Sequence, residues 1–188
     1  MNNDAARAVE FFDKAAELAR VEFDAENLFP VLTEIANYFI QLREFRRALL
    51  LINEQQCISE KSGNTAQKMQ VHDAFANVHF LTGNFQSAIE HRSIILETAE
   101  SLKDENSIAE AHNKLGELYK FHTNYGKALE HHRAALGFFE KQNNLKQLCR
   151  THFFIGNCCN WINELELAEI HLNKSLELAE KIGDPKLR

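Results

Sequence analysis

Apolar residues recur along this chain at helical spacing, in stretches separated by short polar breaks. One stretch covers residues 107–122, and after Thr123 and Asn124 a second one covers residues 125–141. Apolar residues three and four positions apart lie on one face of a helix. Two such stretches joined by a short break predict an antiparallel helix hairpin. The rest of the chain repeats this pattern, so we expect an all-α fold.

The hairpins repeat with a fixed period. Each contains an alanine three positions after an aromatic residue or a leucine, and these alanines stand 40 residues apart: Ala48, Ala88, Ala128 and Ala168. A period of roughly 20 to 50 residues indicates a stacked array, in which every unit buries its apolar face against its neighbours. We therefore expect one α-solenoid of about nine helices, and a fragment of a longer array because neither end supplies a clear polar capping helix. Its expected divisions are a half-repeat at residues 4–24 and repeats at about residues 27–64, 65–104, 105–144 and 145–184.

Small residues mark the contact between the two helices of each hairpin. With the repeated alanine numbered as position 20 of its unit, position 7 is large and position 8 is small; position 8 is Ala36, Ala76, Gly116 and Gly156. Two helices approach closely where a small residue faces the partner helix, and the large neighbour fills the remaining gap. The links at residues 61–64, 141–144 and 181–184 fit the same phase, since each offers a helix-ending glycine or asparagine followed by a capping residue.

Composition and charge exclude several kinds of partner. The formal charge is −6 at pH 7 and the sequence pI is about 5.9, without a cluster of lysine and arginine, so we expect no nucleic-acid partner. No apolar stretch approaches the roughly 20 residues that span a bilayer, so we expect no direct insertion into a membrane. The N-terminal residues lack the basic region and apolar core of a secretory signal, which favours a cytoplasmic protein.

The four cysteines fit the same setting. None has the C-x-x-C spacing of a zinc or redox site, and the adjacent Cys158 and Cys159 would point to different sides of a helix. Together with Cys57 and Cys149 they are interpreted as reduced packing residues.

The histidines form two ladders that invite a metal interpretation. Position 4 is histidine in three repeats and position 23 is histidine in the same three: His72, His112, His152 and His91, His131, His171. Equivalent atoms of stacked repeats lie roughly 10 Å apart, whereas each ligand of a zinc ion lies within about 2.1 Å of it. One ion cannot bind two members of a ladder, so we interpret these residues as parts of the hairpin interfaces and expect no metal site.

Catalytic motifs are absent from the sequence as well. It contains no glycine-rich phosphate loop, no H-E-x-x-H pair and no G-x-S-x-G nucleophile turn. We therefore expect neither an enzyme nor a cofactor.

The small, large and aromatic positions together resemble the tetratricopeptide repeat family. The residues that fit its pattern at matching spacings are Leu115, Gly116, Tyr119, Tyr125, Ala128 and Ala135. The usual unit of that family has about 34 residues. The 40-residue unit is similar to that of the LGN/Pins spindle-orientation proteins, with kinesin light chain and rapsyn as further comparisons. Positions 7 to 9 read Ile35-Ala36-Asn37, Phe75-Ala76-Asn77, Leu115-Gly116-Glu117 and Ile155-Gly156-Asn157, close to the Leu-Gly-Asn tripeptide of LGN.

The resemblance implies a right-handed α-solenoid and a concave groove lined by the first helix of each hairpin. Carried over position by position, the expected partner-binding residues are Asn37, Gln41, Asn77, Phe80, Asn113, Lys114, Glu117, Lys120, Phe121, Arg150, Phe153, Asn157 and Trp161. Asn37, Asn77 and Asn157 carry the most weight, because a carboxamide both donates and accepts and can pair with both groups of a peptide backbone. The alternative is that each asparagine is solvated or bonds its own helix.

Aromatic residues gather toward the C-terminal end of this groove: Phe121, Phe153, Phe154 and Trp161. They would form an anchor pocket of the kind that dominates binding energy, or a core seam that a further repeat covers. The sequence leaves both interpretations open.

The leading functional expectation is an adaptor that binds an extended or helical segment of a partner protein in the groove. The LGN/Pins resemblance implies a partner from cell polarity or spindle orientation, acting at the cell cortex. A chaperone-docking clamp would need lysine at position 5, which is instead Thr33, Asp73, Asn113 and Phe153. Two alternatives stay open: a sensor that changes pitch when it binds a short signalling peptide, and a structural subunit that assembles through its convex face.

Overall fold

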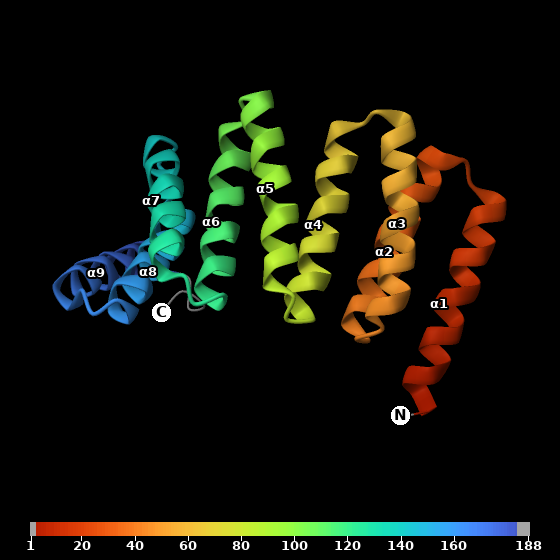
Figure 1. Cartoon of the computed structure of the whole chain (residues 1–188), viewed down its shortest axis with the longest axis horizontal. Coiled ribbons are helices and arrows are strands. Elements are labelled where there is room, and N and C mark those ends of the chain that lie inside the picture. Colours follow the sequence, from red (N-terminus) through yellow and green to blue (C-terminus); the bar gives the residue numbers. More distant parts are fainter. Residues whose placement is uncertain (1–2, 184–188) are drawn as a thin grey trace. The chain divides into compact units, whose positions relative to one another are not determined.

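The computed structural model describes residues 3–183, with residues 3–5 described by their backbone alone. This part of the chain contains nine helices and no strand, which confirms the all-α expectation (Figure 1). In chain order they are α1 (Asn3–Glu22), α2 (Ala25–Gln41), α3 (Phe45–Ser62), α4 (Thr65–Leu81), α5 (Phe85–Leu102), α6 (Glu105–Phe121), α7 (Tyr125–Lys141), α8 (Leu145–Trp161) and α9 (Leu165–Ile182). The chain divides into two compact units, Met1–Gly83 with α1 to α4 and Asn84–Arg188 with α5 to α9.

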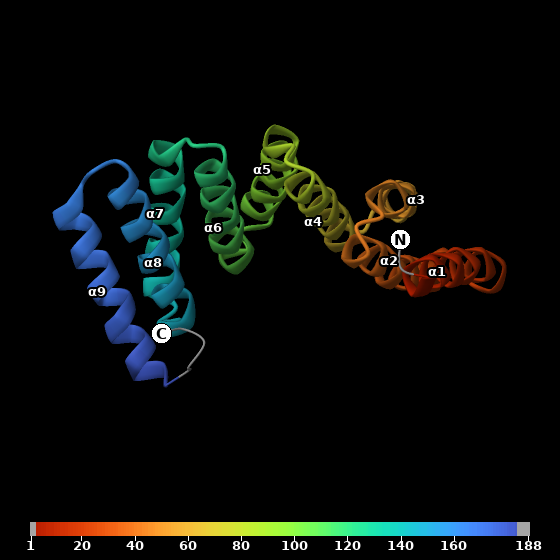
Figure 2. The same ribbon diagram turned by 90° about the horizontal axis from the view of Figure 1, so that it is seen from below.

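The first unit is built around α2, which packs against both α1 and α3 (Figure 2). Leu32, Phe39 and Ile52 form the centre of its core and are at most 1% exposed. From α1, the ring of Phe12 stacks on Tyr38 with centroids 4.5 Å apart and meets Phe39 edge-on at 6.1 Å. Helix α1 therefore contributes side chains to the first core.

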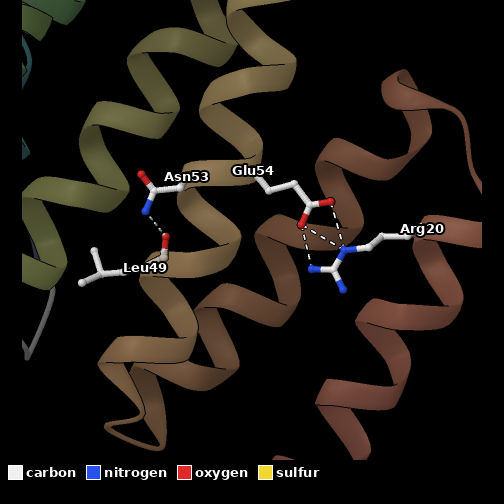
Figure 3. A network of polar contacts seen from close by, with 4 residues as sticks. All are labelled: Arg20, Leu49, Asn53 and Glu54. Carbon is white, nitrogen blue, oxygen red and sulfur yellow. Dashed lines mark hydrogen bonds and ion pairs between the residues drawn. The ribbon is translucent and has the colours of Figure 1, made fainter.

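An ion pair also joins α1 to α3 (Figure 3). Arg20 donates from Nε and Nη2 to the carboxylate of Glu54, with the shortest distance 2.7 Å. Beside it, Asn53 Nδ2 donates to the Leu49 carbonyl oxygen one turn earlier in α3, at 2.7 Å. Since Arg20 and Glu54 are partly exposed, the pair stabilises the fold by no more than about 1 kcal/mol, but its two-pronged geometry fixes the direction of approach.

The second unit consists of two complete hairpins, α6 with α7 and α8 with α9, preceded by α5. Helix α5 packs on α6 and α7 packs on α8, so each first helix lies between two second helices (Figure 1). The repeated alanines are buried throughout the chain: Ala48, Ala88 and Ala128 are 0% exposed and Ala168 is 4% exposed. Buried positions therefore recur with the same 40-residue period as the alanines.

The tight contact expected at position 8 is present in both hairpins of this unit. A Cβ added to Gly116 of α6 would lie 2.5 Å from Cε1 of His132 on α7. A Cβ added to Gly156 of α8 would lie 2.7 Å from Cγ of Leu172 on α9. In each case a side chain at position 24 packs directly on the backbone of the first helix, so only glycine fits.

The turns share one backbone feature. From Arg43 onward, the described turns each contain one residue with a positive φ, between 51° and 79°: Arg43, Gly63, Gly83, Lys103, Thr123, Asn143 and Asn163. The expected helix-ending residues Gly63 and Asn143 are among them, and the following Asn64 and Asn144 accept hydrogen bonds from the next helix. Asp184 lies outside the described residues. Helix α6 begins earlier than expected because the Asp104 carboxylate caps it.

Thr123 is the least suitable residue for this backbone, with φ 58°. A β-branched side chain is strained in the left-handed region, whereas glycine is not. We expect Thr123→Gly to raise the free energy of unfolding by about 1 kcal/mol in urea titration. Gly83 occupies the equivalent turn with φ 79°, so Gly83→Thr should lower the free energy by at least as much. An unchanged midpoint in Thr123→Gly would contradict strain at this turn.

Candidate binding site

The first helices α6 and α8 lie side by side in the second unit and line an open pocket of about 180 Å³. Its lining residues are Glu110, Asn113, Lys114, Glu117, Gln147, Arg150 and Phe154. Four of these seven are among the expected partner-binding residues, and all four come from the first helices of two successive repeats. The structure therefore brings together the part of the groove that α6 and α8 contribute.

Charged and aromatic groups alternate around this pocket. Arg150 Nη2 lies 3.8 Å from Glu117 Oε1, an ion pair that links α8 to α6. Arg150 also lies over the ring of Phe154, with 5.8 Å between the guanidinium carbon and the ring centroid. Lys120 Nζ lies 5.5 Å from the same centroid and 5.0 Å from that of Phe121. Two cations thus face one aromatic ring, an arrangement that suits an anionic or carbonyl-rich ligand.

Asn113 forms the floor of the pocket and is 7% exposed. Its Nδ2 donates to Thr151 Oγ1 of α8 at 2.8 Å, and its Oδ1 accepts from His132 Nδ1 of α7 at 3.0 Å. Because an amide oxygen only accepts, His132 must carry its proton on Nδ1. Both ends of the Asn113 carboxamide therefore bond within the protein, and this residue supports the lining from below.

His132 itself is fully buried, at 0% exposure. Its ring stacks on Phe154 with centroids 5.0 Å apart, and its Nε2 has no hydrogen-bond partner among the described residues. Burial, and then the nearby charge of Lys120, lower the pKa of His132 from 6.5 to about 3. The imidazole is neutral at pH 7 and holds the Phe154 ring in place.

The C-terminal aromatics are partly exposed, and two of them stack on the preceding repeat. Phe121 is 47% exposed and stacks on Phe85 of α5 with centroids 6.1 Å apart. Trp161 is 65% exposed and stacks on Tyr125 of α7 at 5.5 Å, with the rings 3° from parallel. Each ring packs one face against the preceding repeat and leaves the rest accessible. Phe153, at 49% exposure, adds a further accessible ring beside Phe154.

The asparagines of position 9 are divided between the two units. Asn37 of α2 and Asn77 of α4 are exposed on the first unit, whereas Asn157 of α8 is half-buried on the second. The first unit also carries Gln41, which is exposed, and Phe80, which is half-buried. A ladder formed by all three asparagines remains a prediction.

Sequence reasoning missed the layer beneath the site. It did not predict that His132, on a second helix, supports the Phe154 ring, nor that Gln147 and Glu110 complete the lining. One signal was available, because a glycine at position 8 indicates that the side chain at position 24 packs directly on the backbone of the first helix. Histidine is polar, however, so the residue type of His132 did not indicate that it is buried.

The histidine ladders also require a correction. The sequence argument considered only the distance between histidines of the same ladder. In the structure, each short contact joins a histidine at position 4 to the histidine at position 23 of the same repeat. His112 pairs with His131 and His152 pairs with His171, each with 2.9 Å between the Nδ1 atoms. These four histidines do lie at hairpin interfaces, as expected, but they lie there in pairs.

Three of the four cysteines are packing residues, and Cys57 is not. Cys149, Cys158 and Cys159 are at most 2% exposed, while Cys57 is exposed. Burial raises the pKa of Cys158 to about 11, so this thiol is protonated at pH 7. Within residues 3–183, no helix combines the length and apolar character needed to cross a membrane, and no group of three or more histidine, cysteine or acidic side chains is placed to hold one metal ion.

Comparison with known proteins places this architecture. Residues 67–141 match the tetratricopeptide repeat family model. No curated protein sequence matches the chain. Among solved structures, BtubC from P. vanneervenii superposes with a TM-score of 0.80 at 20% identity, over 96% of this chain and 75% of that one. Aspartyl phosphate phosphatase F from Bacillus subtilis gives 0.85 at 18% identity, over 95% of this chain and 47% of that one.

A third structure is PH0952 from Pyrococcus horikoshii, a signal transduction ATPase with a tetratricopeptide repeat sensor. It gives a TM-score of 0.79 at 16% identity, over 93% of this chain and 28% of that one. The chain thus spans three quarters of BtubC but half or less of the other two. These likenesses confirm the all-α solenoid fold. Residues 67–141, from α4 to α7, thus match the tetratricopeptide repeat family, and the same helix hairpin continues on both sides of them.

Proposed function

We propose that this protein is a protein-interaction module, without catalytic activity, that holds a segment of a partner protein across the pocket between α6 and α8. The observation that carries the proposal is the lining of that pocket, which Lys114, Glu117 and Arg150 share with Phe154, and where Arg150 lies over the Phe154 ring. Accessible aromatic rings beside charged groups are typical of binding anchors.

The chemistry of the lining defines the segment. Arg150 and Lys120 both lie over Phe154, so an acidic side chain or a carbonyl group of the segment would meet two cations. Phe153, at 49% exposure, supplies an apolar surface next to them. Asn157 lies one turn farther along α8 and can pair with backbone groups of an extended chain. We infer an extended peptide with an acidic residue close to an apolar one.

Peptide selection tests this proposal. Random peptides displayed on phage are selected on the immobilised protein, and the Kd of each selected peptide is measured by fluorescence anisotropy. We expect Arg150→Ala and Asn157→Ala each to raise the Kd by about tenfold, which corresponds to about 1.4 kcal/mol. Arg150 is a suitable target because its side chain is 49% exposed, so its removal should not unfold the repeat.

Arg133→Ala is the matched control, since Arg133 is an exposed arginine on α7 and does not line the pocket. It should leave the Kd within twofold. Selected peptides that bind Arg150→Ala and Asn157→Ala as tightly as the unaltered protein would rule out this pocket as the binding site.

A peptide sensor is the second candidate function. It is favoured by the likeness to PH0952, whose tetratricopeptide repeats are named a sensor. In a sensor the selected peptide would change the compactness of the protein, which small-angle X-ray scattering measures, whereas an adaptor would keep its radius of gyration.

A role in cell polarity or spindle orientation, and a cytoplasmic location at the cell cortex, are narrower proposals. They are supported by the repeated tripeptides at positions 7 to 9, such as Ile155-Gly156-Asn157. A fluorescent fusion imaged through cell division tests them, since enrichment at the cortex in mitosis is expected and a uniform distribution would contradict both.

A further inference from the structure

Two pairs of histidines join the first and second helices of the complete hairpins in the second unit. His112 of α6 and His131 of α7 have their Nδ1 atoms 2.9 Å apart, and so do His152 of α8 and His171 of α9. All four histidines are half-buried, and the angle between the two ring planes is 43° in the first pair and 38° in the second. The pairs occupy the same positions of two successive repeats.

A separation of 2.9 Å between two Nδ1 atoms means that they share one proton. One imidazole donates and the other accepts, so the accepting nitrogen presents a lone pair toward its partner. Two imidazole ligands at about 2.1 Å from a tetrahedral zinc ion lie about 3.4 Å apart. An ion could take the place of the shared proton if the donating ring changes tautomer, so that its proton moves from Nδ1 to Nε2 by exchange with water. A small rotation of the His112 ring would then lengthen the separation by about 0.5 Å.

We propose that the His112–His131 pair is a binding site for a divalent transition-metal ion of the zinc type, held by the two Nδ1 atoms. Imidazole nitrogen is a preferred ligand of these ions, and water molecules complete the coordination. The ion would tie α6 to α7 at the level of the histidines.

The groups around the ligands favour this site. The His131 ring stacks on Tyr119 with centroids 5.3 Å apart and 12° between the planes, which limits its rotation.

The two pairs differ in the charges that surround them. His112 feels the negative charge of Glu100, and His131 feels both Glu130 and the positive Lys127. The other pair faces positive charge, because His152 feels Lys174 and His171 feels Arg133. A dication is therefore attracted to the first pair and repelled from the second, which makes His152–His171 a control of the same geometry.

The test is a zinc titration of tag-free, chelator-treated protein at pH 7, followed by isothermal titration calorimetry. Three proteins are compared: the unaltered protein, His131→Gln and His171→Gln. Glutamine retains a polar side chain in the hairpin, and circular dichroism verifies that all three proteins keep the same helical content. We expect His131→Gln to weaken zinc binding by at least tenfold and His171→Gln to change it by less than twofold.

A second measurement identifies the ligands directly. In histidine-selective NMR spectra, zinc should shift the ring signals of His112 and His131 before those of His152 and His171. Three results would each overturn the proposal: no zinc binding by the unaltered protein, binding that survives His131→Gln, or an equal loss in His171→Gln.

Discussion

Replacing Gly116 with alanine is expected to lower the free energy of unfolding by about 3 kcal/mol, the upper range for overpacking a core. The new Cβ would lie 2.5 Å from Cε1 and 2.6 Å from Nε2 of His132, closer than any ordinary contact. The imidazole cannot retreat, because its other face stacks on Phe154 and its Nδ1 donates to Asn113. The whole arrangement of α6, α7 and α8 must therefore adjust.

Thermal unfolding followed by circular dichroism measures this effect, and Gly137→Ala is the matched control. Gly137 lies within α7, and a Cβ added there would meet nothing within 4 Å. Alanine favours a helix interior over glycine by about 1 kcal/mol, so this substitution should raise the melting temperature. If both alanine variants shifted the melting temperature in the same direction, the close contact between Gly116 and His132 would be excluded.

The second large effect concerns acid. The pKa of His132 is about 3 in the folded protein and 6.5 when the residue is free in water. Between pH 6.5 and pH 3, the unfolded chain therefore binds a proton at His132 that the folded chain does not bind. The contribution of His132 to the free energy of unfolding is fully present above pH 6.5 and is lost as the pH falls toward 3. Between pH 7 and pH 4 we expect His132 alone to remove about 3 kcal/mol of the free energy of unfolding.

His132→Gln isolates this contribution, since glutamine can still donate to Asn113 but does not titrate in this range. Its absolute stability will be lower because the smaller side chain packs less well, so the comparison is between slopes. Urea titrations at several pH values should give a shallower dependence on pH for the variant by about 3 kcal/mol over that interval. The other histidines with lowered pKa, such as His112 and His152, act in the same direction in both proteins and cancel. Equal slopes would mean that His132 is not a buried neutral base.

The sequence was sufficient for the repeat, the hairpins and the tight contacts. Ala128 and Gly116 occupy positions where only a small side chain fits, and such positions are visible as a period. The groove positions implied by the resemblance to the tetratricopeptide repeat family also included Lys114, Glu117 and Arg150, which line the pocket.

The buried polar layer could not be predicted in the same way. Asn113 and Asn157 are the same residue type on neighbouring first helices, yet Asn113 is committed to Thr151 and His132. That difference depends on which polar groups meet after the helices have packed, and a linear pattern does not contain it. The pairing of His112 with His131 could not be predicted for the same reason, because these residues lie on two different helices and meet only after the helices have packed.

The stack of Trp161 on Tyr125 gives the protein a built-in optical reporter. Trp161 is the only tryptophan of the chain, and it ends α8, whereas Tyr125 begins α7. At 65% exposure the indole is held on one face alone, so its fluorescence follows the contact between α7 and α8. Circular dichroism follows every helix at once. Tryptophan fluorescence can therefore detect the separation of α8 from α7 even when circular dichroism shows that the helices remain intact. Local opening between the third and fourth repeats can thus be observed without a label.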